Sequence, residues 1–234
     1  MVKKILSARS PIKSLEKNLK GGIGPGQVGV FASRKGVGKT ACLVQIALDR
    51  LFEGKPVIHV SYASRVDYII AWYEELFKKL AHLEKLKSEM EIHDRIVRNR
   101  VILNFRQEGM KTEQVLRSIE ALLGPGNFSA KTIIVDGFNF YLPCAEDLAQ
   151  FKKFAVDRQL EFWFSCSLRG EDPLFNDQGL PFVLKDYLAS LDIILTLEHD
   201  NDRVRLNLVK DHGQILSKKL RLELDPQTLL LIRI

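Results

Sequence analysis

The sequence predicts an α/β protein with a mostly parallel central sheet, helices on both faces and antiparallel strands at its C-terminal end. Five short apolar segments alternate with segments of helical periodicity, which indicates a parallel sheet covered on both faces. A glycine-rich loop joins the first of these segments to a helix, and the final part of the chain changes to an alternating apolar and polar pattern. With 234 residues, 46% of them hydrophobic and 27% charged, the chain fits one domain with a large core.

We expect residues 1–20 to be a basic N-terminal arm ahead of a single domain formed by residues 21–234. Glu16 is the only acidic residue of the arm, against Lys3, Lys4, Arg9, Lys13, Lys17 and Lys20. Such a segment either contacts nucleic acid or is solvated and loosely held, and we favour the second interpretation. Residues 21–26 then form a turn-rich entry to the first strand.

The first strand, Val28 to Ala32, leads into a glycine-rich loop and then an apolar helical pattern. Strand, glycine-rich loop, Gly-Lys-Thr and helix is the order of a phosphate-binding P-loop, although the consensus opens with Gly where this chain has Ser33. The backbone N–H groups of such a loop and the start of its helix bind phosphate. We expect Lys39 to reach the outer phosphates and the Thr40 hydroxyl to bind Mg²⁺. The predicted nucleotide site consists of Ser33, Arg34, Lys35, Gly36, Val37, Gly38, Lys39, Thr40 and Ala41.

Two basic residues inside this loop, Arg34 and Lys35, are unusual. They either add positive charge to the phosphate site or project into solvent, and the sequence favours neither interpretation.

The remaining elements follow from apolar periodicity and from turn residues. Strands are expected at 57–61, 101–105, 132–136 and 162–166. Helices are expected over most of 66–98, over 112–123 with Thr112 as the N-cap, over 145–158, and as a short helix that ends at 188. Short strands are expected at 193–197, 203–210, 218–224 and 228–234. Asp136 ends the fourth apolar strand, where it binds magnesium directly or through water, or else serves as a turn residue before Gly137. The P-loop upstream favours the magnesium role.

A resemblance to a known family covers most of the chain, from about residue 12 to the end. The first part of the chain resembles the start of RecA-like ATPases of the KaiC, RadA and DnaB helicase type. The segments that carry this resemblance are 19–22, 25–28, the glycine-rich loop, 43–47 and 54–61. Asp136 resembles the Walker B aspartate of that family. Later segments also agree in order, namely Ser165 to Arg169, Leu191 to Ile194 and the Val209 to Gly213 hairpin, which resembles a Lys-x-Arg-Gly hairpin.

The resemblance implies a RecA-like P-loop NTPase fold that binds ATP with Mg²⁺ at a subunit boundary, and therefore a homo-oligomer. It also implies catalytic roles for Lys39, Asp136, Lys210 and His212, with the last two reaching the γ-phosphate of a neighbouring subunit.

Three departures from the family weaken the expectation of hydrolysis. The family's catalytic glutamate lies in a segment like Val-Ser-x-Glu, whereas residues 60–64 contain no carboxylate, and loss of such a base lowers a rate by about 10²- to 10⁴-fold. In the family an arginine of the Lys-x-Arg-Gly hairpin reaches the γ-phosphate of the neighbouring subunit and raises the rate of hydrolysis on the order of 10³- to 10⁵-fold. His212 stands at that position in this chain. The family has a polar sensor residue, often Gln, in its fifth strand, and that position corresponds to Cys166 or Ser167 here. Asp67 or Glu74 remains a candidate replacement for the base.

We therefore expect an ATP-binding regulator or assembly factor with weak or impaired hydrolysis, and an active DNA-associated ATPase is the alternative. The loops expected to face DNA, 137–146 and 170–181, have no basic residue, although a phosphate-binding channel needs Lys or Arg. A small-molecule kinase fits the P-loop but not the tail. A GTPase is disfavoured because the sequence lacks the Asn-Lys-x-Asp motif that recognises guanine.

Composition indicates a cytoplasmic protein. No apolar run has the length of a membrane span, and no signal peptide is apparent. Three distant cysteines indicate reduced thiols, and the five histidines show no ligand spacing, so we expect no metal site made of protein side chains alone. A net charge of +6 permits an acidic partner without requiring one.

Overall fold

The structure is a computed structural model that describes residues 10–19, 24–63, 65–106, 109–124, 128–200 and 202–234. The described strands form one nine-stranded sheet in the order β3-β2-β4-β5-β1-β6-β7-β8-β9. Strands β1 to β6 pair in parallel, and β6 to β9 pair antiparallel. The predicted α/β architecture with antiparallel C-terminal strands is therefore confirmed.

The parallel part of the sheet alternates with helices, as expected. Its elements are β1 (Val28–Arg34), α3 (Lys39–Phe52), β2 (Val57–Ser61), α4 (Val66–Leu83), α5 (Glu89–Arg98), β3 (Arg100–Asn104), α6 (Thr112–Leu123), β4 (Thr132–Asp136), α7 (Ala145–Arg158) and β5 (Glu161–Leu168). The 3₁₀ helix η1 (Phe182–Tyr187) connects β5 to the C-terminal part. That part consists of β6 (Ile193–Asp200), β7 (Arg203–Asp211), β8 (Gln214–Leu224) and β9 (Leu231–Arg233).

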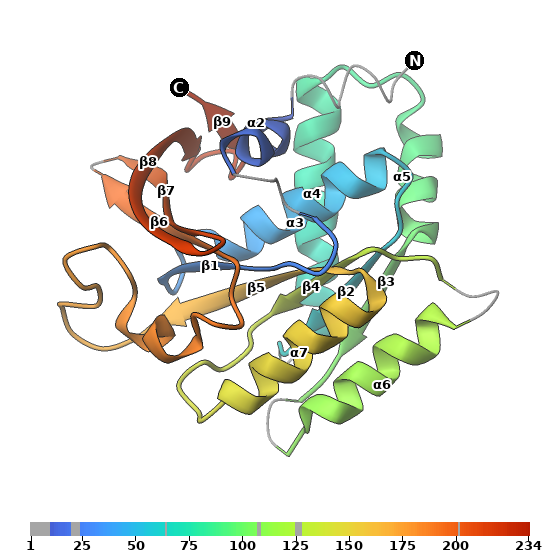
Figure 1. Ribbon diagram of the computed structural model, residues 1–234. Helices are drawn as coiled ribbons and strands as arrows, with labels where there is room; N and C mark the ends of the chain where they lie inside the picture. The colour runs from blue at the N-terminus through green and yellow to red at the C-terminus, as the bar shows by residue number, and fades with distance from the viewer. Residues whose placement is uncertain (1–9, 20–23, 64, 107–108, 125–127, 201) are drawn as a thin grey trace.

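Two apolar layers cover the sheet. Helices α2 (Pro11–Asn18), α3, α4 and α5 pack on one face and α6 and α7 on the other (Figure 1). Alternate residues of each central strand enter opposite layers: Trp163 of β5 joins the α3 layer, whereas Phe162 and Phe164 join the α7 layer. Buried on both faces, these strands are apolar along nearly their whole length.

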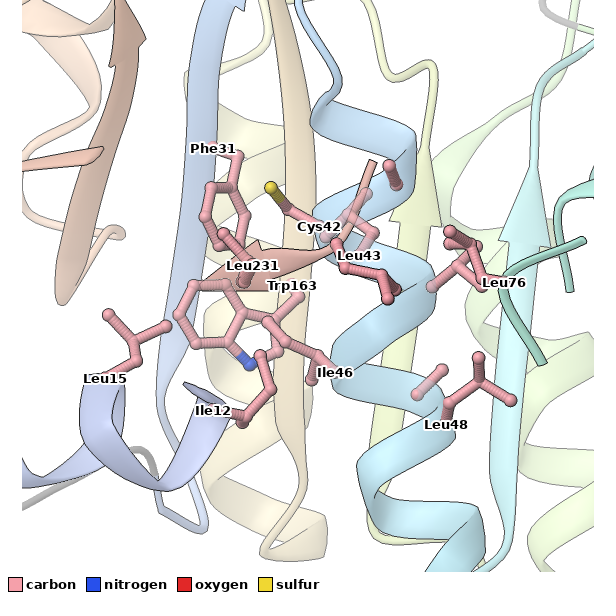
Figure 2. Close-up of a cluster of buried hydrophobic side chains, with 14 of the residues drawn as sticks. Ile12, Leu15, Phe31, Cys42, Leu43, Ile46, Leu48, Leu76, Trp163 and Leu231 are labelled. Carbon is pink, nitrogen blue, oxygen red and sulfur yellow. The ribbon is translucent and has the colours of Figure 1, made fainter. Parts of the chain in front are cut away.

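The N-terminal segment corrects one expectation. Residues Pro11–Asn18 form helix α2, with Ser10 as its N-cap, instead of the loosely held arm that we expected there. Figure 2 shows Ile12 and Leu15 of α2 in the same buried cluster as Trp163 of β5 and Leu231 of β9. The rest of the expected arm, Lys3, Lys4, Arg9 and Lys20, and the entry residues 21–23 lie outside the described residues.

Several boundaries also differ from the prediction. The N-cap of α6 is Lys111, whose backbone N–H donates to Gln114 Oε1, so Thr112 is the first helical residue and not the cap. The helical stretch at 66–98 is two helices, and β8 starts earlier than expected because it pairs with β7 over most of its length. Strands β2 and β4 have the predicted bounds.

Candidate functional site

The glycine-rich loop lies at the carboxyl end of β1. Strand β1 ends at Arg34 and α3 begins at Lys39, with Gly38 as the residue before the helix. Gly36 and Gly38 have φ values of +85° and +112°, a region in which a side chain costs about 1–2 kcal/mol. A Cβ on Gly38 would also lie 2.2 Å from Leu224 Cδ2. The backbone of the loop therefore depends on both glycines.

The Lys39 amine is held inside this loop. It donates to the backbone oxygens of Ser33 and Arg34 at 3.0 and 2.8 Å, and to Ser33 Oγ at 3.2 Å. Burial lowers the pKa of Lys39 to about 8, with an opposing contribution from Asp136. Ser33, which stands where the consensus has Gly, thus contributes a hydroxyl to the lysine. The amine contacts only neutral oxygens there, so it retains charge that an anion can neutralise.

Thr40 and Asp136 come together beneath the loop. Thr40 Oγ1 donates to Asp136 Oδ2 at 2.9 Å, although 96 residues separate them. Strand β5 lies between β1 and β4, and its Ser165 hydroxyl donates to Asp136 Oδ1 at 2.5 Å. The backbone N–H of Gly137 donates to the same serine oxygen at 2.9 Å. A hydroxyl and a carboxylate oxygen beside a cationic loop are ligands of the kind that Mg²⁺ prefers.

Ser165 is the site residue that the sequence reasoning missed. We expected the polar residue of the fifth strand at Cys166 or Ser167. Cys166 is fully buried in the α7 layer, on the face opposite to α3. Ser167 lies on the same face as Ser165 but two residues closer to the end of β5. The signal was available, because strand alternation places Ser165 on the face of Trp163, and Trp163 packs against α3.

The two basic residues of the loop behave differently. Arg34 donates to the Gly170 carbonyl at 3.0 Å and forms an ion pair with Asp172 at 3.0 Å. Both partners belong to the loop that follows β5. Lys35 is exposed and forms no ion pair with a described residue. Val37 and Ala41 are buried in the α3 layer, so they offer a ligand their backbone groups and not their side chains.

Lys210 and His212 lie at the other edge of the sheet. Lys210 is opposite Ile194 of β6, which is opposite Val30 near the start of β1. The hairpin between β7 and β8 is therefore roughly 20 Å from the glycine-rich loop, the length of β1. The structure brings Lys39, Thr40 and Asp136 together but does not bring Lys210 or His212 to them within one chain.

Both hairpin residues have partners at this amino edge. Lys210 is buried, its amine donates to the Leu191 carbonyl, and burial lowers its pKa. The ring of His212 lies 2.6 Å from Asp211 Oδ1 through Nδ1 and 2.7 Å from Gln27 Nε2 through Nε2. Because Gln27 Oε1 accepts from Gly24 N, the glutamine amide donates to His212 Nε2, and Nδ1 then carries the proton toward Asp211.

After β2 an aromatic residue, Tyr62, precedes Ala63, the position at which the resembled family has its glutamate. The Tyr62 ring packs against Phe105 and Phe138, at 6.4 and 6.2 Å between centroids. Its backbone N–H donates to the Asp136 carbonyl at 2.9 Å. This packing fills the position beside Asp136 with a ring that is no base at neutral pH, since burial raises the pKa of Tyr62 to about 12.

The two candidate replacements for the base have partners elsewhere. Asp67 is exposed and pairs with Arg65 at the start of α4. Glu74 forms a hydrogen bond to His93 of α5 at 2.7 Å. Neither contact directs a carboxylate to the glycine-rich loop.

Other features bear on cofactors and location. All three cysteines are buried and free. In the part of the chain that the structure describes, no three His, Cys, Asp or Glu side chains lie close enough to hold a metal ion. No described helix combines the length and apolar character needed to cross a membrane.

Comparison with known proteins gives no assignment. No model of a known protein family matches the chain, and no curated protein matches it.

Proposed function

We propose that this chain is a RecA-like P-loop protein that binds Mg·ATP at residues 33–41 and hydrolyses it slowly at most. In this proposal ATP acts as a ligand of a nucleotide-dependent regulator or assembly factor. The observation that carries the proposal is the 2.9 Å contact between Thr40 and Asp136 beneath a loop that holds the Lys39 amine.

Each part of the site has a role toward a triphosphate. The loop N–H groups and the start of α3 face the β-phosphate, and Lys39 exchanges its bonds to the loop carbonyls for bonds to the outer phosphates. Thr40 and Asp136 supply oxygen ligands to Mg²⁺, whose remaining ligands are phosphate oxygens and water. The loop lies at the carboxyl edge of the sheet, where parallel α/β sheets bind their ligands.

Slow hydrolysis follows from what surrounds the site. Tyr62 and Ala63 occupy the end of β2 without a carboxylate to orient water, and Asp67 and Glu74 are engaged elsewhere. Because Lys210 and His212 lie at the opposite edge, they act on a phosphate only in a neighbouring subunit. We therefore propose a homo-oligomer with nucleotide at its subunit boundary.

The test is the affinity of the purified chain for Mg·ATP by isothermal titration calorimetry. Lys39→Ala removes the buried amine that the loop oxygens hold, so we expect no measurable binding, whereas wild type binds. Lys78→Ala, which removes an exposed lysine on α4, is the matched control and should bind as wild type does. Thermal unfolding checks that both variants fold. Unchanged affinity in Lys39→Ala would remove the proposal.

A further inference from the structure

A cavity opens beside the glycine-rich loop. It has a volume of about 410 Å³ and is lined by Lys35 of the loop, by residues 137–141 after β4, and by Ser167 and Arg169 at the end of β5. This volume is in the range of small-molecule sites. Lys35 belongs to both, but Lys39, Thr40 and the loop glycines do not line the cavity, so it adjoins the part of the loop that we propose for the triphosphate.

The charge of this cavity favours an anion. Lys35 and Arg169 are its charged lining residues, and none of its lining residues is acidic. Within the described ranges neither forms an ion pair, whereas the adjacent Arg34 is paired with Asp172. Two cations that lack counter-ions attract a ligand with one or two negative charges.

The cavity wall also presents aromatic rings. Phe138, Phe140 and Tyr141 line it, and Phe138 packs edge to face against Phe140 at 5.1 Å and against Phe151 at 5.9 Å. The buried cluster fixes the orientation of the Phe138 and Phe140 rings, so a flat ligand meets a preformed surface.

Tyr141 connects the ring surface to the charged one. Its hydroxyl accepts from the Arg169 backbone N–H at 2.7 Å, and the Arg169 guanidinium lies 5.4 Å from the centre of the Tyr141 ring. The loops after β4 and β5 are thereby tied together across the cavity. A ligand that stacks on the rings thus places its charged end near Arg169 and Lys35.

We propose that this cavity binds a second small molecule with a flat ring and a single phosphate group, of the nucleoside monophosphate class. Its phosphate contacts Arg169 and Lys35, and its ring lies against the aromatic wall. The position beside the outer phosphates rests on the proposed function, but the binding itself does not, because the lining residues are separate from Lys39 and Thr40.

The test uses the full chain saturated with Mg²⁺ and a non-hydrolysable ATP analogue. AMP, GMP, CMP and UMP are titrated in turn and followed by calorimetry. We expect at least one to bind the loaded protein. Arg169→Gln should weaken that binding about tenfold or more, because it removes a charge-assisted hydrogen bond. Arg158→Gln, which removes an exposed arginine of α7 paired with Glu120, is the matched control and should bind as wild type does.

The outcomes separate this proposal from the previous one. If the analogue binds but no monophosphate does, or if monophosphates bind only by displacing the analogue, the cavity proposal is wrong and the proposed function stands. If the analogue does not bind, the proposed function fails, and titration of the free protein with and without Arg169→Gln still decides the cavity. Arg169-dependent binding of a single-stranded oligonucleotide without monophosphate binding would overturn the small-molecule class.

Discussion

The carboxyl and amino edges of the sheet both carry charged side chains, but they arrange them differently. At the carboxyl edge the Lys39 amine contacts only backbone and hydroxyl oxygens, and its pKa falls to about 8. At the amino edge Lys152 pairs with Asp192 at 2.6 Å, and the His212 ring lies 2.6 Å from Asp211. The Lys39 amine thus retains charge that an anion can neutralise, whereas Lys152 and His212 each have a carboxylate partner within the chain.

We propose that this difference separates ligand-binding residues from residues that hold the fold. Desolvating a cation without an opposite charge costs free energy, and an incoming anion recovers it. A cation already paired with a carboxylate recovers little, because the ligand has to displace that partner. We therefore expect substitutions at the carboxyl edge to change nucleotide chemistry, and substitutions at the amino edge to change mainly stability or assembly.

The largest effect that we expect within this comparison is a gain in hydrolysis at the carboxyl edge. Ala63→Glu places a carboxylate at the position where the resembled family has its base, so turnover should rise by about 10²- to 10⁴-fold. Ala63→Gln, of equal size but without the charge, is the control. Steady-state ADP release, with and without single-stranded DNA at fixed salt, is the measurement.

Two results would count against slow hydrolysis in the wild type. Wild-type turnover in the ordinary range of about 1–10³ s⁻¹ would mean that another group already serves as base. A strong increase with single-stranded DNA would favour the alternative of an active DNA-associated ATPase. No change in Ala63→Glu would mean that the end of β2 does not face the γ-phosphate.

A smaller effect is expected from pH. The amine of Lys39 binds phosphate in its protonated form, and burial lowers its pKa from 10.5 to about 8. The charged fraction, and with it the affinity for Mg·ATP, should therefore be complete below pH 7 and fall about tenfold between pH 7 and pH 9. Lys39→Arg keeps its charge over this range and corrects for the ionisation of ATP itself. A wild-type decline no steeper than that of Lys39→Arg would contradict the role of the amine.

The sequence predicted the carboxyl edge better than the amino edge, for a physical reason. A loop that binds phosphate needs glycines, a lysine and a hydroxyl at fixed spacing, so the order of residues 33–40 is enough to predict such a loop there. Thr40 and Asp136 are both predicted ligands of Mg²⁺, and the structure places their side chains in contact at 2.9 Å. The rotamer of Lys39, by contrast, decides which oxygens its amine contacts. The spacing of residues in the sequence does not specify that rotamer.

Charge concealed local structure at the N-terminus. Ser10 before Pro11 is a helix start, and Ile12 and Leu15 have helical spacing, yet the excess of lysines suggested a solvated arm. Lys13 instead pairs with Glu53 at 2.8 Å while Ile12 and Leu15 enter the core. A similar limit applies to Lys210, because pairing of β7 with β6 buries it and no local pattern reveals that.

The smallest effect is expected at the amino edge. His212 has a φ of +55°, and asparagine tolerates that backbone region, so His212→Asn removes the ring without adding strain. Loss of the contacts to Asp211 and Gln27 should lower the free energy of unfolding by about 0.5–1.5 kcal/mol, measured by urea denaturation. The affinity of the monomeric chain for Mg·ATP should stay within about twofold of wild type, because β1 separates the two edges by roughly 20 Å. Gln178→Asn, in the exposed part of the loop before η1, is the control for a new asparagine away from the amino edge. A clear fall in monomer affinity in His212→Asn would show that the amino edge acts on the loop of its own chain and that charge balance does not separate the two edges.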